Sequence, residues 1–412
     1  MIYSMEKEKE RMILVGVSGG SQQEAAASLK ELEELAETAG AEVASKILQN
    51  REGIHPATYV GRGKLEEIRQ LLYHLEADGI ICDDELTPAQ MKNLEQELSC
   101  KIVDRTLLIL DIFAARARTS EGKLQVEMAQ LKYRQARLVG LRSSLSRLGG
   151  GIGTRGPGEK KLEMDRRLIS SRIAALRREL EEVQQHRDVL REGREKGNFR
   201  TAAIVGYTNA GKSTLLNVLT GAGVLEEDAL FATLDPTTRL LDLPGGGEIL
   251  LTDTVGFIRK LPHHLIDAFK STLEEAVLAD IIVHVVDASS PQMDEQMHVV
   301  YETLRELGAE GKPIVTLFNK QDKRQEERVC RDLQADYSLR VSAKTGMGLE
   351  EFRETLEKIL LEQQIYVERL YSYNEAGKIA LIRRRGQLMS EEYLPEGIQI
   401  KAYVPRDIYG KI

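Results

Sequence analysis

Short apolar runs alternate with amphipathic segments over the first hundred residues. Runs rich in Val, Ile and Leu predict buried strands at 12–18, 42–49, 57–61, 79–84 and 100–106. The spacing of apolar residues between these runs predicts helices around 22–39, 63–77 and 88–97. Because repeated strand–helix units build parallel sheets covered by helices, we expect a small α/β domain here.

From Leu124 onward the apolar residues recur in steps of three, four and seven. The seam consists of Leu124, Met128, Leu131, Leu138, Leu145 and Leu148, followed by Ile169, Ile173, Leu176, Leu180, Val183 and Leu190. Such a seam predicts two long helices that pack against each other. The glycine-rich stretch 149–163 (GGGIGTRGPGEKKLE) separates them. We therefore expect an antiparallel hairpin within one chain, with this stretch at its tip, and not a dimer interface.

The second half of the chain returns to alternating strands and helices. The segment 193–200 (GREKGNFR) is predicted to break the hairpin helix. Further strands are predicted at 248–253, 281–287, 313–318 and 338–342, and helices around 265–279, 292–308 and 348–361. The tail suggests a small α+β unit from 365–372, 378–386 and 398–405, with Arg383, Arg384 and Arg385 at a solvated strand end.

These patterns predict a multidomain α/β protein. The predicted domains are an N-terminal α/β domain (1–122), a helical hairpin (123–197), a doubly wound nucleotide-binding domain (198–364) and a small α+β domain (365–412). The composition, with 42% hydrophobic and 30% charged residues, is that of a globular protein. No apolar run is long enough for a membrane anchor, and the N-terminus lacks the apolar region of a signal peptide.

Charge and cysteine content refine this prediction. The net charge of −8 does not indicate nucleic-acid binding, yet residues 123–195 carry 17 Lys and Arg against 10 Asp and Glu. The hairpin is therefore locally basic within an acidic chain. Three cysteines without metal-ligand spacing are typical of a reducing compartment, so we expect a cytoplasmic protein.

One segment matches a phosphate-binding loop. Residues Gly206, Tyr207, Thr208, Asn209, Ala210, Gly211, Lys212 and Ser213 form the pattern G-x-x-x-x-G-K-S. The pattern follows an apolar strand and precedes a helix, which is the context that this motif requires. Backbone N–H groups of 209–213 would surround the β-phosphate, and Lys212 would reach the β- and γ-phosphates. The Ser213 hydroxyl would coordinate Mg²⁺.

A second motif predicts guanine as the base. Asn319, Lys320, Gln321 and Asp322 form N-K-x-D at the end of a predicted strand. The Asp322 carboxylate would accept hydrogen bonds from the guanine N1–H and 2-amino group, and adenine has no such pair of donors. A base without them leaves a buried carboxylate unpaired, which is costly. Ser342, Ala343 and Lys344 follow another strand and would place a backbone N–H against the guanine O6.

Two segments between these motifs are candidates for nucleotide-dependent switches. In Asp253, Thr254, Val255 and Gly256, the Asp would hold Mg²⁺ through water and the Gly256 N–H would sense the γ-phosphate. The stretch 231–239 (FATLDPTTR) lies where a first switch is expected, and spacing alone leaves Thr233, Thr237 and Thr238 open as its Mg²⁺ ligand.

Phe257 occupies the position where many GTPases carry a water-orienting Gln, so we hypothesise that a partner surface assists hydrolysis.

The glycine-rich stretch 149–163 allows three interpretations. It contains G-x-G-x-x-G, but it follows a heptad-patterned helix and not a strand, which argues against a dinucleotide site. A flexible loop is the second interpretation. The third, which we favour, is contact with RNA: glycines allow close backbone approach, and Arg155, Lys160 and Lys161 at the tip would neutralise phosphates.

Taken together, these motifs resemble the HflX family of GTPases over nearly the whole chain. The resemblance rests on 206–217 (GYTNAGKSTLLN), 231–239, 253–258 (DTVGFI), the N-K-x-D and SAK motifs, 149–163 and 59–68 (YVGRGKLEEI). It implies GTP or GDP and Mg²⁺ as cofactors. It also implies nucleotide contacts by Phe231, Ala232, Thr233, Leu234 and Asp235, with Thr233 and Ser213 as Mg²⁺ ligands. Catalytic roles are then expected for Lys212, Thr233 and Gly256.

The resemblance further implies a cytoplasmic GTPase that acts on ribosomes, and the hairpin within one chain leads us to expect a monomer. It implies binding to the RNA of the large ribosomal subunit through the N-terminal domain and the 149–163 tip. The leading hypothesis is that the protein splits stalled ribosomes under stress. The alternative is a large-subunit assembly or checkpoint factor, which would use the same site residues on a different substrate.

Overall fold

The structure is a computed structural model that describes residues 9–145, 157–196, 200–221, 230–260, 262, 273–324, 329–362 and 364–412. The chain divides into two compact units. The first holds the described residues up to Arg187 together with 230–235 and 255–260, and the second holds most of the rest, including 200–221, 236–254 and 274–412.

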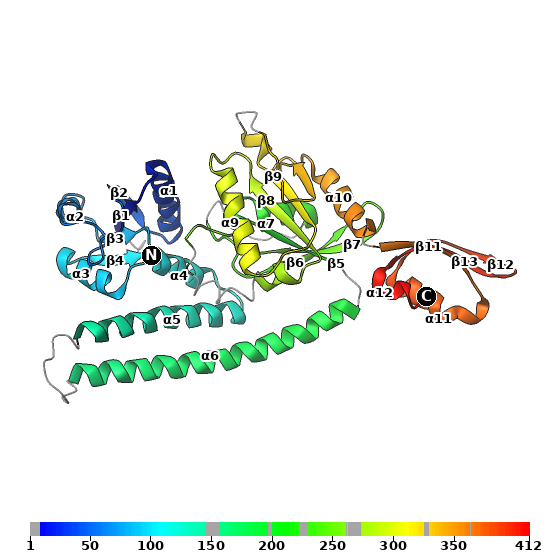
Figure 1. Cartoon of the computed structure of the whole chain (residues 1–412), viewed down its shortest axis with the longest axis horizontal. Helices are drawn as coiled ribbons and strands as arrows, with labels where there is room; N and C mark the ends of the chain where they lie inside the picture. The colour runs from blue at the N-terminus through cyan, green and yellow to red at the C-terminus, as the bar shows by residue number, and fades with distance from the viewer. Residues whose placement is uncertain are drawn as a thin grey trace, which may run out of the picture. The chain divides into compact units, whose positions relative to one another are not determined.

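A four-stranded parallel sheet forms the centre of the N-terminal α/β region. Its strands are β1 (Arg11–Ser18), β2 (Glu42–Asn50), β3 (Gly79–Cys82) and β4 (Lys101–Asp104), in the order β2-β1-β3-β4. The helices are α1 (Gln22–Thr38), α2 (Arg62–His74), α3 (Pro88–Leu98) and α4 (Arg105–Arg116). Figure 1 shows α2 and α3 on one side of the sheet and α1 and α4 on the other. Helices on both faces explain why the strands are continuous apolar runs.

The predicted strand at 57–61 is wrong. The structure has only an isolated bridge between His55 and Tyr59 there. Tyr59 has a φ of 65°, a left-handed conformation that a strand does not contain. Its ring is buried and its hydroxyl donates to Asp84 Oδ2 at 2.7 Å, so a contact distant in sequence fixes this segment.

The predicted hairpin is formed by α5 (Ser120–Leu145) and α6 (Pro157–Lys196), which lie side by side in Figure 1. Within the first unit, Arg172 Nε donates to Glu127 Oε1 at 2.7 Å and Gln135 Nε2 donates to Ser170 Oγ at 2.8 Å, so the helices are antiparallel. Of the tip, 149–156 lies outside the described residues and 157–163 begins α6. The helix break predicted at 193–200 is wrong at its start, since α6 continues to Lys196.

The second unit contains a six-stranded sheet in the order β10-β9-β8-β5-β7-β6. Its strands are β5 (Arg200–Gly206), β6 (Thr237–Asp242), β7 (Glu248–Asp253), β8 (Ile281–Asp287), β9 (Ile314–Asn319) and β10 (Tyr337–Arg340). Only β6 among them is antiparallel to its neighbour. The helices α7 (Lys212–Thr220), α9 (Met293–Glu306) and α10 (Leu349–Glu362) accompany the sheet (Figure 1). The predicted doubly wound α/β fold is confirmed.

The C-terminal residues form a small α+β unit, as predicted. An antiparallel sheet of β11 (Gln364–Tyr371), β13 (Gly397–Pro405) and β12 (Gln387–Leu394) packs against α11 (Ala376–Arg385), and α12 (Arg406–Tyr409) follows. Arg383–Arg385 end α11, so their placement at a strand end is wrong: Ile379 and Ile382 repeat at helical spacing and are buried. In the part of the chain that the structure describes, every helix is too short or too polar to cross a bilayer.

Candidate nucleotide site

The loop between β5 and α7 is shaped by two glycines. Gly206 has a φ of 156°, and a Cβ there would lie 2.2 Å from the Val285 carbonyl oxygen. Gly211 has a φ of 95°, and its Cβ would lie 2.4 Å from Asn319 Nδ2. Any side chain at either position would collide, so glycine is required where the loop lies against β8 and β9. The loop thereby leads directly into the N-terminus of α7, whose N–H groups favour anions.

Lys212 is folded back onto this loop. Its side chain is buried, and Nζ donates to the carbonyl oxygens of Tyr207 at 2.9 Å and Gly206 at 3.3 Å. The pKa of Lys212 is lowered to about 8, mainly by burial; Asp253 opposes this shift and Lys320 adds to it. A buried ammonium with a depressed pKa is stabilised by an anion, so a phosphate group fits this position.

A hydroxyl and a carboxylate meet beside the loop. Ser213 Oγ donates to Asp253 Oδ2 at 2.7 Å, and Asp253 is fully buried at the end of β7. Thr254 Oγ1 donates to the Ile204 carbonyl oxygen at 2.8 Å, which ties β7 to β5. The described residues hold no cluster of three or more His, Cys, Asp or Glu for a metal. Mg²⁺ uses one or two carboxylates together with water and phosphates, so this oxygen pair fits it.

The base-recognition motif is held by Asn319. Its Nδ2 donates to the Ala210 carbonyl oxygen at 2.9 Å, and its Oδ1 accepts from Ala343 N at 2.9 Å. One side chain thus joins the phosphate-binding loop to the SAK segment. Lys320 has a φ of 61°, and its Nζ lies 2.8 Å from Asp287 Oδ2.

Asp322 presents its carboxylate to solvent. Its Oδ1 accepts from Ser342 Oγ at 2.6 Å, and this hydrogen bond is the main reason that the pKa of Asp322 is lowered. Ser342 therefore orients one carboxylate oxygen while the side chain as a whole stays exposed. Gln321 is the variable residue of the motif, between Lys320 and Asp322, and its Nε2 donates to the Phe318 carbonyl oxygen at 3.0 Å. Lys344 follows Ala343 and is exposed.

Within the second unit, the structure brings part of the predicted site together. The second unit holds the phosphate-binding loop, Asp253, Thr254, the N-K-x-D motif and the SAK segment. Of the candidate switch segments 231–239 and 253–256, residues 231–235 and 255–256 belong to the first unit, and 236–239 and 253–254 belong to the second. Of the three open candidates for the switch threonine, Thr237 and Thr238 lie in β6, whereas Thr233 lies outside regular secondary structure.

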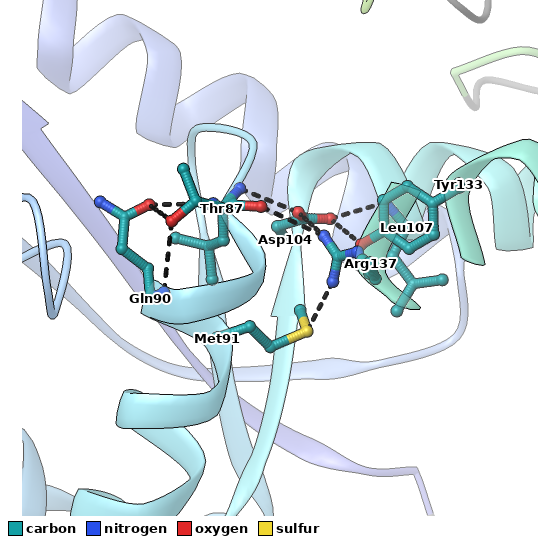
Figure 2. Close-up of polar contacts among 8 residues, drawn as sticks. Thr87, Gln90, Met91, Asp104, Leu107, Tyr133 and Arg137 are labelled. Carbon is teal, nitrogen blue, oxygen red and sulfur yellow. Dashed lines mark hydrogen bonds and ion pairs between the residues drawn. The ribbon is translucent and has the colours of Figure 1, made fainter. Parts of the chain in front are cut away.

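The sequence analysis missed a polar cluster that attaches the hairpin to the α/β region (Figure 2). Its centre is Asp104, which is fully buried at the end of β4 and caps α4 by accepting from Leu107 N at 2.9 Å. The same carboxylate accepts from Tyr133 Oη at 2.7 Å and Arg137 Nη2 at 2.6 Å, both on α5. The Arg137 guanidinium also lies 3.8 Å from the Tyr133 ring centroid. The N-cap pattern marks Asp104 in the sequence, but its partners on α5 have no local signature.

Comparison with known families covers most of the chain. Residues 26–114 match the family model described as GTP-binding GTPase N-terminal, and 116–194 match the GTP-binding GTPase middle region. Residues 201–320 match the model described as 50S ribosome-binding GTPase.

Individual relatives and a solved structure are also similar to the chain. "GTPase HflX" of Lacrimispora saccharolytica is 65% identical, over 98% of this chain and 96% of that protein. "GTPase HflX" of Caldanaerobacter subterraneus is 52% identical, over 98% and 94%. A GTP-binding protein from Sulfolobus solfataricus, solved in complex with GDP, is 26% identical, covering 85% of this chain and 98% of that chain with a TM-score of 0.45.

Proposed function

Because the chain belongs to the HflX family of GTPases, we propose that it binds the large ribosomal subunit and uses GTP binding and hydrolysis to split stalled ribosomes under stress. The observation that supports this most is the match of 201–320 to a 50S ribosome-binding GTPase, together with the guanine-type site of the same region. In this proposal the protein is a cytoplasmic monomer that binds ribosomes.

The nucleotide part of the proposal assigns a role to each motif. The loop 206–213 would hold the phosphates, with the Lys212 ammonium on the β- and γ-phosphates. Asp322, oriented by Ser342, would select guanine, and Asn319 would keep the loops together. Ser213, Asp253 through water, and Thr233 would hold Mg²⁺, which when bound neutralises charge on the β- and γ-phosphates. The remaining predicted contacts, 231–235, 254–256 and 342–344, would complete the site.

The basic hairpin supplies the contact with RNA in this proposal. Arg166 and Arg167 are exposed on α6, next to the tip that also carries Lys160 and Lys161. Cationic side chains at the end of a long hairpin release counterions when they neutralise RNA phosphates. The hairpin and the N-terminal domain would therefore bind the large subunit, and hydrolysis at the nucleotide site would time release.

Sedimentation of ribosomes through a sucrose gradient tests the proposal. The protein is added with GTP, GDP or a non-hydrolysable GTP analogue. We expect it to migrate with the large subunit in the GTP-type states only, and the peak of intact ribosomes to decrease. A Lys212→Ala variant serves as the control that cannot use nucleotide.

Two other results would change the proposal. Binding to the large subunit without loss of the intact-ribosome peak would favour the assembly or checkpoint factor. Absence of co-migration in every nucleotide state would contradict ribosome binding and leave a GTPase with another partner.

A further inference from the structure

The segments expected to respond to GTP are anchored on the N-terminal region within the first unit. The first, 230–235, contains Leu230, Phe231 and Leu234, all of which are buried. The Phe231 ring meets the Phe113 ring of α4 edge-on, with centroids 4.6 Å apart. An apolar anchor of this kind holds the segment against α4 by burial.

Asp235 fixes the start of the hairpin helix α5. Its Oδ2 accepts from the backbone N–H groups of Arg118 and Thr119, both at 2.9 Å, and its Oδ1 accepts from the Thr119 hydroxyl. Thr119 in turn caps α5, since its Oγ1 accepts from Gly122 N at 2.9 Å. A Cβ on Gly122 would lie 2.5 Å from Asp235 Oδ1, so glycine permits this approach. A carboxylate at a helix N-terminus is favourable in both hydrogen bonding and dipole interaction.

Lys260 anchors the second segment, 255–260, to the end of β3. Its Nζ lies 2.6 Å from Asp83 Oδ2 and 2.7 Å from Asp84 Oδ1. Asp83 is buried and also pairs with the buried Arg105 at 2.9 Å. Removal of Lys260 would leave the negative charges of two adjacent carboxylates, Asp83 and Asp84, less well compensated. This ion pair therefore contributes more to stability than an ordinary surface pair.

We propose that the N-terminal region and hairpin sense the bound nucleotide through these two anchors, with Asp235 linking the first switch to α5 and Lys260 linking the second switch to β3. The inference rests on the proposed function, because it takes Thr233 and Gly256 as the groups that respond to the γ-phosphate. Asp235 is two residues from Thr233, and Lys260 is four from Gly256. Because so few residues lie between them, a movement of Thr233 is expected to displace Asp235, and a movement of Gly256 is expected to displace Lys260.

The hairpin can pass such a change onward. Helix α5 is held at its start by Asp235 and again at Tyr133 and Arg137 by Asp104 (Figure 2). The two attachments are about 20 Å apart along the helix at 1.5 Å per residue. A helix held at two points responds as one body, so a loss or shift of the Asp235 contact is expected to change the orientation of α5.

Hydrogen exchange in two nucleotide states tests the inference. The full chain is first saturated with GDP or with a non-hydrolysable GTP analogue, and binding is verified with a fluorescent nucleotide. We expect the amides of Arg118 and Thr119 to exchange at rates that differ about fivefold or more between the two states, a common size of coupling. The first turn of α3, which is capped by Thr87 and not by a switch residue, is the internal control and is expected to exchange equally.

Two sets of variants separate coupling from simple damage. Thr119→Val removes the hydroxyl between Asp235 and α5 but keeps the two backbone hydrogen bonds to Asp235, so it is expected to reduce the state dependence. Thr119→Ser is expected to retain it, and the Thr87→Val cap variant is expected to leave it intact. Lys260→Glu is expected to change the ratio of analogue to GDP affinity several-fold. Lys260→Arg, which keeps a positive charge beside both Asp83 and Asp84, is expected to leave the ratio unchanged.

The outcomes distinguish the inference from the function on which it rests. Equal exchange of the Arg118 and Thr119 amides in both states, with nucleotide bound in each, would overturn the inference and leave the proposed function standing. Failure of the chain to bind either nucleotide would overturn both. An affinity ratio that Lys260→Glu leaves unchanged would overturn the part assigned to the second switch.

Discussion

At the scale of single residues, the pKa of Lys212 makes nucleotide binding depend on pH. Burial lowers that pKa to about 8, so the ammonium is mostly protonated at pH 7 and mostly neutral at pH 9. A bound triphosphate favours the protonated form, and linkage then requires affinity to fall as pH rises through the pKa of the free protein. We expect the affinity for a GTP analogue to drop about tenfold from pH 7 to pH 9.

Fluorescent-nucleotide titrations across this range provide the measurement. A Lys212→Arg variant is the matched control, because a guanidinium stays charged throughout. Its affinity, even if weaker, should vary much less with pH. A flat profile for the unchanged protein would contradict the role given to the Lys212 ammonium.

The second prediction at the scale of single residues concerns Asp322 and the preference for guanine. Replacing it by Asn puts an amide, with one donor and one acceptor, where the proposal needs two acceptors facing the base. We expect GDP affinity to fall about 30-fold or more, the loss of hydrogen bonds to a charged group. Ser342→Ala keeps the carboxylate but removes the hydroxyl that orients it at 2.6 Å, so it should have a smaller effect in the same direction. Competition between GDP and ADP measures the preference, and an unaltered preference in Asp322→Asn would count against this assignment.

At the scale of elements, Asp104 determines how firmly the hairpin is attached. The carboxylate is fully buried and joins β4, α4 and α5 through Leu107, Tyr133 and Arg137. Asp104→Ala would leave the Arg137 charge and the Tyr133 hydroxyl without this acceptor. We expect the free energy of opening of α4 and α5, from native-state hydrogen exchange, to fall by about 3–5 kcal/mol.

The exposed pair of Glu127 and Arg172 provides a matched control on the same hairpin. Glu127→Ala removes an ion pair between two partly exposed side chains on α5 and α6. Exposed pairs contribute little to stability, so the opening free energy should hardly change. Equal effects of Asp104→Ala and Glu127→Ala would contradict the importance given to the buried carboxylate.

The hairpin tip is the next element for which we make a prediction. Reversing Lys160 and Lys161 to Glu should weaken binding to large subunits and reduce its dependence on salt, since fewer counterions are released. Intrinsic GTP hydrolysis should stay unchanged. Arg177→Glu with Arg178→Glu changes the same charge on exposed positions further along α6 and should weaken binding less. Loss of intrinsic hydrolysis in the tip variant would indicate instead that the tip supports the nucleotide domain.

At the scale of the whole molecule, local pattern predicted the elements better than their long-range contacts. The strands β1, β3 and β8 could be predicted from their continuous apolar runs, because each of them is buried on both faces. The strands β6 and β12 were missed because they are partly exposed at sheet edges and carry polar residues. Contacts that span the chain, such as Asp235 with Thr119 or Tyr59 with Asp84, leave no periodic signal.

The same limit applies to the candidate site. The phosphate-binding loop, N-K-x-D and SAK motifs are local patterns whose loops lie together, with Asn319 bridging Ala210 and Ala343. The switch segments were predicted from the same motifs, but their anchors on Phe113, Thr119 and Asp83 depend on the folded first unit. The predicted domain boundaries and nucleotide contacts remain predictions.

The last prediction concerns the whole complex with the ribosome. Phe257 follows the D-x-x-G motif and is 2% exposed, and its ring cannot orient an attacking water as a Gln does. Hydrolysis by the isolated protein should therefore be slow, and large ribosomal subunits should raise the single-turnover rate more than about tenfold, a modest value for a partner-assisted GTPase. Small subunits at the same concentration are the control and should have little effect. If the isolated protein already hydrolysed GTP at the rate reached with large subunits, no assistance from a partner would be needed, and Phe257 would have to be compensated by residues of this chain.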